Sequence, residues 1–176
     1  MIETPRLMLR PPLPSDTLAL HAMWSDPRVM VDLGPVKSLA DSIATIARHE
    51  AYRAAHVLGF WTTLRKDTGA VIGFCGLKPG AEDTPIAGEV EVGWMLAASH
   101  WRQGFAREAA EASLAWGWAN TGAARIVAIT AAQNVASRAL MARLGMMRIA
   151  PLDFTHPKYA AHDARRTTVV YSIDRA

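Results

Sequence analysis

The sequence predicts a single α/β domain built around a mixed β-sheet. Two strand-like segments near the middle of the chain form a hairpin, and a strand–helix–strand–helix run follows in the second half. The segment RIVAITA at 125–131 is nearly all apolar, as buried parallel strands are. The length of 176 residues suits one ordinary domain, and no repeat, linker or low-complexity segment divides it.

The N-terminal part of the chain is expected to form one strand and two helices. Segment 6–10 alternates in polarity and is ended by a proline-rich turn, which suits a strand that stops there. Ser15 or Asp16 is expected to cap a helix that residues 26–27, Asp-Pro, interrupt. A second helix is expected over about 38–55.

Three strands and a long helix are expected next. FWTTLRK (60–66) and AVIGFCGL (70–77) are rich in β-branched and aromatic residues, and the Asp-Thr-Gly between them is a hairpin signal. After a polar loop, EVEVGWML (89–96) is the next alternating strand. Apolar residues then recur at helical spacing over 104–120.

The C-terminal part completes the strand–helix–strand–helix unit. After the apolar strand at 125–131, a helix is expected with Asn134 as its cap and Gly145 as its stop. The segment 151–166 is expected to be a loop, and TTVVYSID at 167–174 a last strand.

Composition and charge exclude several classes of protein. Lys and Arg (19) against Asp and Glu (16) give +3, too little for a nucleic-acid footprint by charge alone. No apolar stretch approaches the ~18 residues of a membrane span, and the N-terminus lacks the apolar run of a signal peptide. The single cysteine, Cys75, has apolar neighbours, so we expect a buried and unreactive thiol. These features indicate a soluble, unprocessed cytoplasmic protein.

A phosphate-binding turn is the clearest chemical feature. In WMLAASHWRQGFAREAAEA a glycine-containing turn directly follows a strand and opens a long helix, so free backbone N–H groups point out together. Gly104 lets the backbone approach an anion closely, while Arg102 and Arg107 add positive charge. A glycine that serves only helix packing is the alternative.

The motifs in combination resemble those of the GNAT N-acyltransferases, in the branch that includes the RimJ/RimL ribosomal-protein acetyltransferases. The resemblance runs nearly end to end, through TPRLMLRPPLPSD, WSDPRVM, DTGAVIGFCGL, EVEVGWML, WRQGFAREA and NVASRALMARLGM. It implies the GNAT fold over residues 1–176: a mixed central sheet of about six to seven strands with helices on both faces.

The same resemblance implies how coenzyme A (CoA) is bound. The pyrophosphate would lie on the turn and first helical residues, and the pantetheine amides would pair with the end of the preceding strand; the residues implied are Arg102, Gln103, Gly104, Phe105, Ala106 and Arg107 for the former and Met95 and Leu96 for the latter. Trp101 departs from the Gln or Arg of the general family motif, which weakens a side-chain contact there and leaves the backbone turn intact.

Acetylation of an amine needs a base near the strand that flanks the thioester. Glu89 and Glu91 share a strand face, roughly 7 Å apart at ~3.4 Å per residue. Glu91 is our choice because it occupies the Glu place of the family's EVGW-like stretch, and burial or the neighbouring Glu89 is expected to raise its pKa. The alternative is a solvated or salt-bridged carboxylate.

The helix that begins near Asn134 carries the candidates for handling the thiol. In related enzymes this Asn side chain reaches the pantetheine, although capping alone would explain it, and Ser137 would face the sulfur one turn on. Many family members carry a tyrosine as acid where this chain has Met141. Ser137 is therefore the substitute for the acid, and solvent is the alternative.

The resulting hypothesis is an acetyl-CoA-dependent N-acetyltransferase for a small amine or a protein N-terminal α-amine, without a metal and possibly homodimeric. A CoA-binding sensor without turnover is the main alternative, and an RNA- or ribosome-binding module is disfavoured by the modest charge. The loop 151–166 is expected near the acceptor. Four apolar side chains either line the acceptor pocket or belong to the core: Trp24, Met30, Phe60 and Trp61.

Overall fold

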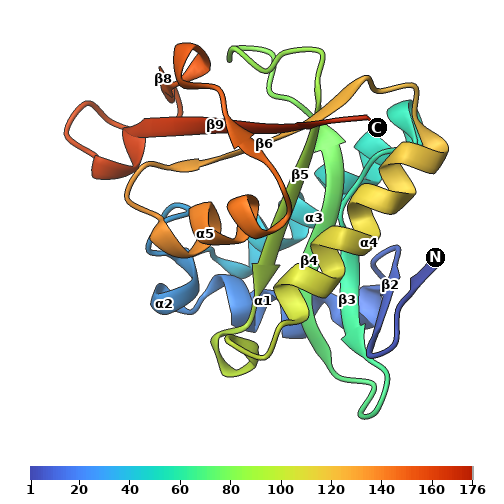
Figure 1. The fold of residues 1–176 in the computed structure, drawn as a ribbon. Helices are drawn as coiled ribbons and strands as arrows, with labels where there is room; N and C mark the ends of the chain where they lie inside the picture. The colour runs from blue at the N-terminus through green and yellow to red at the C-terminus, as the bar shows by residue number, and fades with distance from the viewer. Residues whose placement is uncertain (176) are drawn as a thin grey trace.

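A computed structural model describes residues 1–175 and shows a single nine-stranded sheet (Figure 1). The strand order is β1-β2-β3-β4-β5-β6-β9-β7, and β8 also pairs with β9. The strands are β1 (Ile2–Glu3), β2 (Leu7–Arg10), β3 (Trp61–Arg65), β4 (Val71–Pro79), β5 (Val90–Leu96), β6 (Arg125–Ala131), β7 (Met147–Arg148), β8 (Phe154–Thr155) and β9 (Thr167–Asp174). The six longer strands are those expected from the sequence, and the three additional strands have two residues each.

Helices cover both faces of the sheet, which confirms the expected α/β architecture (Figure 1). The helices are α1 (Thr17–Trp24), α2 (Pro27–Met30), α3 (Leu39–His56), α4 (Phe105–Asn120) and α5 (Val135–Arg143). In Figure 1, α4 and α5 lie in front of the sheet, while α1 and α3 lie behind it. None of these helices is long and apolar enough to cross a membrane within the described residues.

Local capping explains where the first helices begin. Ser38 caps α3: its hydroxyl accepts a hydrogen bond from Asp41 N, and the Asp41 carboxylate accepts one from Ser38 N. The helix expected over 38–55 is therefore confirmed. Asp16 is the N-cap residue of α1, one of the two expected, but its side chain accepts no hydrogen bond from that helix. Asp16 instead accepts from Leu13 N (2.8 Å) and pairs with Arg10, which holds the proline-rich turn.

The sheet changes character between β5 and β6. These strands are parallel, but they pair only at Val90↔Ile126 and Glu91↔Val127. Beyond that point β5 stays with β4 as far as Leu96, and β6 stays with β9 as far as Ala131. The two strands therefore diverge toward their C-terminal ends and leave a V-shaped opening in the sheet.

Two cores pack against the two faces. Under α4 and α5, Leu77 and Val92 pack with Leu114, Ile126 and Met141. On the opposite face, the four side chains that were weighed as an acceptor pocket divide: Trp24, Met30 and Phe60 belong to the core under α1–α3, and Trp61 packs on the other side against Trp116. All four are buried, so the core alternative holds for them.

Candidate active site

The start of α4 presents uncapped backbone donors. Gly104 is the N-cap residue and has φ 82°, a left-handed conformation that favours glycine. No side chain among residues 1–175 accepts from the first turn of this helix. Since the first N–H groups of a helix have no intrahelical partner, they remain available for an anion. The turn therefore has the local geometry that the sequence predicted.

Side chains fasten the turn that precedes α4. Trp101 donates its indole N–H to the Leu96 carbonyl (2.8 Å), and Gln103 Nε2 donates to the Ser99 carbonyl (3.0 Å). Trp101 thus has a structural role at the place where the family motif has a phosphate-contacting residue. Arg102 is exposed and has a φ of 60°, unusual for a residue other than glycine. Arg107 is also exposed and pairs with Glu111 (2.7 Å).

The other two residues of the expected phosphate turn lie against the protein. Phe105 is buried in the core between β2 and α4, and Ala106 is half-buried beside it. Their backbone N–H groups belong to the uncapped first turn, whereas their side chains face inward. A contact with a ligand at these two positions would therefore be made by the backbone.

The end of β5 divides its backbone groups between two neighbours. Ala97 N donates to Ile72 O (2.9 Å), and the Cys75 thiol contacts the Met95 carbonyl (3.7 Å), so the backbone of Met95 faces β4. Because successive residues of a strand turn their backbone groups to opposite edges, Trp94 and Leu96 face the V-shaped opening. The geometry thus favours Trp94 and the Leu96 N–H over Met95 for pairing with a ligand in the opening, since the Leu96 carbonyl already accepts from Trp101.

The start of α5 lies at the same end of the sheet as the start of α4, because β5 and β6 are parallel and each leads into its helix. Asn134 is buried, and its Oδ1 caps α5 by accepting from Ser137 N (3.0 Å). Ser137 is half-buried and its hydroxyl forms no hydrogen bond with residues 1–175. Met141 is only 2% exposed and packs in the core under α4 and α5.

Both candidate bases form ion pairs. Glu91 is buried and is contacted by Lys78, its cross-strand neighbour on β4. Glu89 precedes β5 by one residue and pairs with Arg125 (2.6 Å). The charged group beside Glu91 is therefore the Lys78 ammonium. Both carboxylates are salt-bridged, which is the alternative to a free base that the sequence left open.

Two side-chain hydrogen bonds join loops that are distant in the sequence. The Tyr159 hydroxyl donates to the Leu33 carbonyl (2.8 Å), and Gln133 Nε2 donates to Asp32 Oδ1 (2.9 Å). These bonds join the segment between α2 and α3 to the end of β6 and to the segment 151–166. No local sequence pattern signals contacts between residues about a hundred positions apart.

His49 is a second feature that the sequence did not reveal. It is 3% exposed, its ring packs against Phe60 and Phe74, and its Nδ1 accepts from Phe60 N (3.1 Å). Burial, with smaller contributions from neighbouring cations such as Arg48 and Lys78, lowers the pKa of His49 to about 3. The imidazole is therefore neutral at physiological pH.

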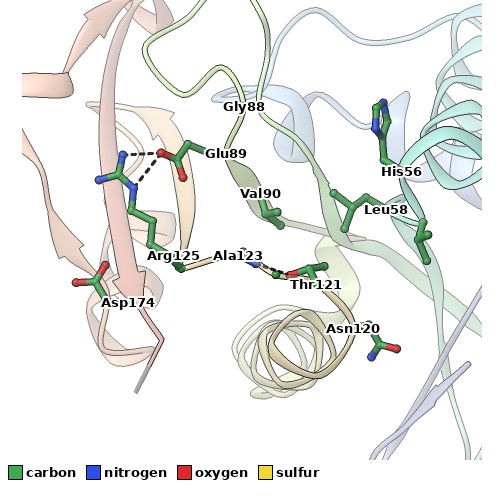
Figure 2. Close-up of a pocket in the computed structure, with 13 residues that line it drawn as sticks. His56, Leu58, Gly88, Glu89, Val90, Asn120, Thr121, Ala123, Arg125 and Asp174 are labelled. Atoms are coloured by element: carbon green, nitrogen blue, oxygen red, sulfur yellow. Dashed lines mark hydrogen bonds and ion pairs between the residues drawn. The ribbon is translucent and has the colours of Figure 1, made fainter.

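A hollow of the surface contains none of these groups except Glu89 and its partner Arg125, and Figure 2 shows its lining. It is lined by the N-terminal ends of β5 and β6 and the C-terminal end of α4, where the Glu89–Arg125 pair is found. The starts of α4 and α5 lie at the other ends of these elements. Among residues 1–175, no group of three or more His, Cys, Asp or Glu side chains is placed to hold a metal ion.

The fold and the site define the class of N-acyltransferases that the motifs resemble. A family model described as an acetyltransferase (GNAT) domain matches residues 6–147, and the chain belongs to the GNAT acetyltransferase family. The chain is 29% identical over 150 residues to the uncharacterized N-acetyltransferase YoaA of Bacillus subtilis (strain 168), which covers 84% of this chain and 83% of that protein.

Solved structures share the fold. The crystal structure of an acetyltransferase from Agrobacterium tumefaciens str. C58 has a TM-score of 0.80 and 26% identity, covering 99% of this chain and 94% of that chain. The ribosomal L7/L12 α-N-protein acetyltransferase RimL in complex with coenzyme A has a TM-score of 0.77 at 18% identity, covering 97% of this chain and 95% of that chain. The second likeness concerns the fold alone.

Proposed function

We propose that this protein is an acetyl-CoA-dependent N-acetyltransferase of the RimJ/RimL-like branch, formed as a single domain over residues 1–176. The observation that carries the proposal is the uncapped start of α4, with Gly104 in the left-handed conformation, beside the opening between β5 and β6. The CoA complex of the RimL fold supports the donor. The acceptor would be a primary amine, either a small molecule or a protein N-terminus.

The residues present suit CoA. The first-turn N–H groups from Gly104 to Arg107 would donate to the pyrophosphate, with exposed Arg102 adding charge. The backbone groups of Trp94 and Leu96 face the opening and would pair with the pantetheine amides. Asn134, at the start of α5, would contact the pantetheine from the other side of the opening. CoA supplies the acetyl thioester, and its acyl carbon is what the amine attacks.

Glu91 would act as the base that takes the proton from the attacking amine. It is the buried carboxylate at the point where β5 and β6 part, and Lys78 contacts its Oε2. A purely structural ion pair is the competing role. For Glu91 to act as the base, Lys78 must leave one of the two Glu91 carboxylate oxygens free, because the amine proton needs a lone pair to accept it.

The Ser137 hydroxyl would donate a hydrogen bond to the leaving sulfur. Its side chain is half-buried in the first turn of α5 and bonds to none of residues 1–175, so it is available. A sensor without turnover is the competing function, favoured by the buried Met141 where many relatives carry a tyrosine acid. A thiolate is a fair leaving group, which makes a weak donor sufficient.

The test of the donor site compares Gly104→Val with Gly88→Val. The two glycines have nearly equal φ, 82° and 81°, so a valine strains both backbones by roughly 1–2 kcal/mol, and at Gly104 its Cβ would in addition lie 3.2 Å from Arg6 Nη2. Gly88 lines the surface hollow near the Glu89–Arg125 pair, away from the start of α4. We expect calorimetry to show at least about a hundredfold weaker CoA binding in Gly104→Val and unchanged binding in Gly88→Val. Equal binding by both folded variants would remove the pyrophosphate assignment.

A second measurement separates the enzyme from the sensor. Thiol release from acetyl-CoA is followed with a panel of amines and N-terminal peptides. Acceptor-dependent release supports the transferase, whereas tight CoA binding without release by any acceptor supports the sensor.

A further inference from the structure

The turn before α4 is contacted by an arginine of the N-terminal segment. Arg6 Nη1 donates to the Gln103 carbonyl (2.9 Å), and its guanidinium lies 4.5 Å from the centre of the Phe105 ring. Arg6 is far from this turn in the sequence and precedes β2. Among residues 1–175, Arg6 is the residue whose side chain hydrogen-bonds to the carbonyl of Gln103, immediately before Gly104.

Arg6 is itself held in place by Glu108, one turn into α4. Glu108 Oε2 accepts from Arg6 Nε (2.7 Å) and pairs with Nη2 (2.6 Å), while Oε1 accepts from Arg6 N (2.9 Å) and from the Thr4 hydroxyl (2.6 Å). Burial alone would raise the pKa of Glu108, but the bonds from Thr4 and Arg6 lower it. The Arg6 side chain is 48% exposed, and its guanidinium is oriented by the two contacts to Glu108 and the bond to the Gln103 carbonyl.

The Arg6 bond fixes the orientation of one peptide group. No peptide bond among residues 1–175 is cis, and in a trans peptide the C=O and the following N–H point in opposite directions. The Gln103 carbonyl points toward Arg6, on the side of β1 and β2. The Gly104 N–H therefore points away from β2. In the strand order, β2 lies on one side of β5 and the V-shaped opening lies on the other.

We propose that Arg6 is a positioning residue for coenzyme A: by holding the Gln103 carbonyl it directs the Gly104 N–H toward the pyrophosphate. The inference rests on the proposed function, because it assigns the anion at this turn to CoA. Arg6 acts through the peptide and does not itself contact the ligand. The role explains why two ionic contacts, two neutral donors and an aromatic face converge on a segment that precedes the first long strand.

Arg65 provides a matched control. Its guanidinium also lies over the Phe105 ring, 5.4 Å from the centroid, but it pairs with Asp67 and does not bond to the turn. Arg6→Gln and Arg65→Gln each remove one positive charge near the same ring. We expect the calorimetric Kd for CoA to rise about ten- to a hundredfold in Arg6→Gln and to stay within about twofold in Arg65→Gln.

Two further readouts separate positioning from general stability. In protein labelled with ¹⁵N-glycine, the Gly104 amide resonance should move in Arg6→Gln before ligand is added, while that of Gly88 should not. The KM for acetyl-CoA should rise with its Kd, whereas the KM for S-acetylpantetheine, which lacks the pyrophosphate, should stay the same. A role in folding alone would change both KM values together.

Equal CoA affinities in Arg6→Gln and Arg65→Gln would overturn the proposal. If Arg6→Gln does not fold, Glu108→Gln replaces it, because the amide keeps the shape and loosens the guanidinium. We then expect about two- to fivefold weaker CoA binding and a moved Gly104 resonance, and an unchanged Kd and resonance would overturn the proposal. Failure of the wild-type protein to bind CoA would instead defeat the proposed function.

Discussion

The two sides of the candidate site are built in different ways. The proposed donor side comprises the start of α4, where backbone N–H groups of one short segment depend on the conformation of Gly104, and Ser137 in the first turn of α5. The proposed acceptor side consists of side chains from separate parts of the chain, among them Glu91, Lys78 and Tyr159. A backbone site tolerates many side-chain changes, whereas a side-chain site changes its chemistry with each substitution.

The difference suggests how relatives can share a donor and differ in acceptor. Any sequence that keeps the turn conformation keeps the anion site, so the donor side is expected to vary little. On the acceptor side, a substitution at the Lys78–Glu91 pair or in the bridging loops changes charge and access directly. The predictions below test whether turnover depends more on the acceptor side than on the donor side.

The largest effect is expected on the acceptor side. Glu91→Gln should lower kcat by roughly 10² to 10⁴, the range for the loss of a general base, with the calorimetric Kd for CoA unchanged. Glu89→Gln is the control, because Glu89 is also ion-paired but lines the surface hollow away from the start of α4. A larger loss in Glu89→Gln than in Glu91→Gln would make Glu89 the base and place the division between the two sides elsewhere.

The core under α1–α3, where His49 is buried, is expected to weaken in acid. The pKa of His49 is about 3 in the folded chain and about 6.5 when unfolded, so as pH falls below about 6.5 the unfolded state takes up the proton first. His49 alone should therefore cost about 2 kcal/mol of unfolding free energy between pH 7.5 and pH 5. Most carboxylates remain ionised in this window.

Urea unfolding at the two pH values measures this loss. His49→Gln removes the titrating group and keeps an acceptor for Phe60 N, so its unfolding free energy should change by much less between the same pH values. His156, whose pKa burial lowers to about 4, contributes in the same direction and remains in both proteins. An equal pH dependence in wild type and variant would show that His49 is protonated without cost.

The smallest effect is expected on the donor side. Ser137→Ala should lower kcat by only about tenfold to a hundredfold, because it removes one donor that solvent partly replaces. Met141→Tyr should give no large gain, since Met141 is buried and a phenol would overpack the core. Rates are measured from pH 6 to 9. Full activity of Ser137→Ala would assign protonation to solvent, and strong acceleration by Met141→Tyr would favour a degenerate enzyme.

The sequence was most informative where structure depends on neighbours along the chain. The strands, the Ser38 capping box and the turn at Gly104 follow from local patterns, and the structure contains them. Asp16 does occupy the N-cap position of α1, but its carboxylate bonds to Arg10 and Leu13 N and does not cap the helix, which the local pattern could not show. The preference for Trp94 and Leu96 at the opening depends on strand register, which the sequence alone leaves open.

Long-range contacts could not be predicted in the same way. Lys78 beside Glu91 is visible only once β4 and β5 are paired, and the Tyr159–Leu33 bond joins segments from opposite ends of the chain. Arg6 belongs to a segment whose local pattern indicates a strand and a family resemblance but no contact with α4. Its bond to the Gln103 carbonyl became apparent when β1, β2 and α4 were placed together.

The burial of Cys75 has a practical consequence for measuring this protein. The thiol is fully enclosed, and burial raises its pKa to about 11, so less than about one in a thousand molecules carries the thiolate at pH 7.5. Disulfide-exchange dyes should therefore leave the folded chain colourless. One equivalent of colour per chain should appear only on global unfolding, which makes this cysteine a built-in reporter of denaturation and of damaged protein in a preparation.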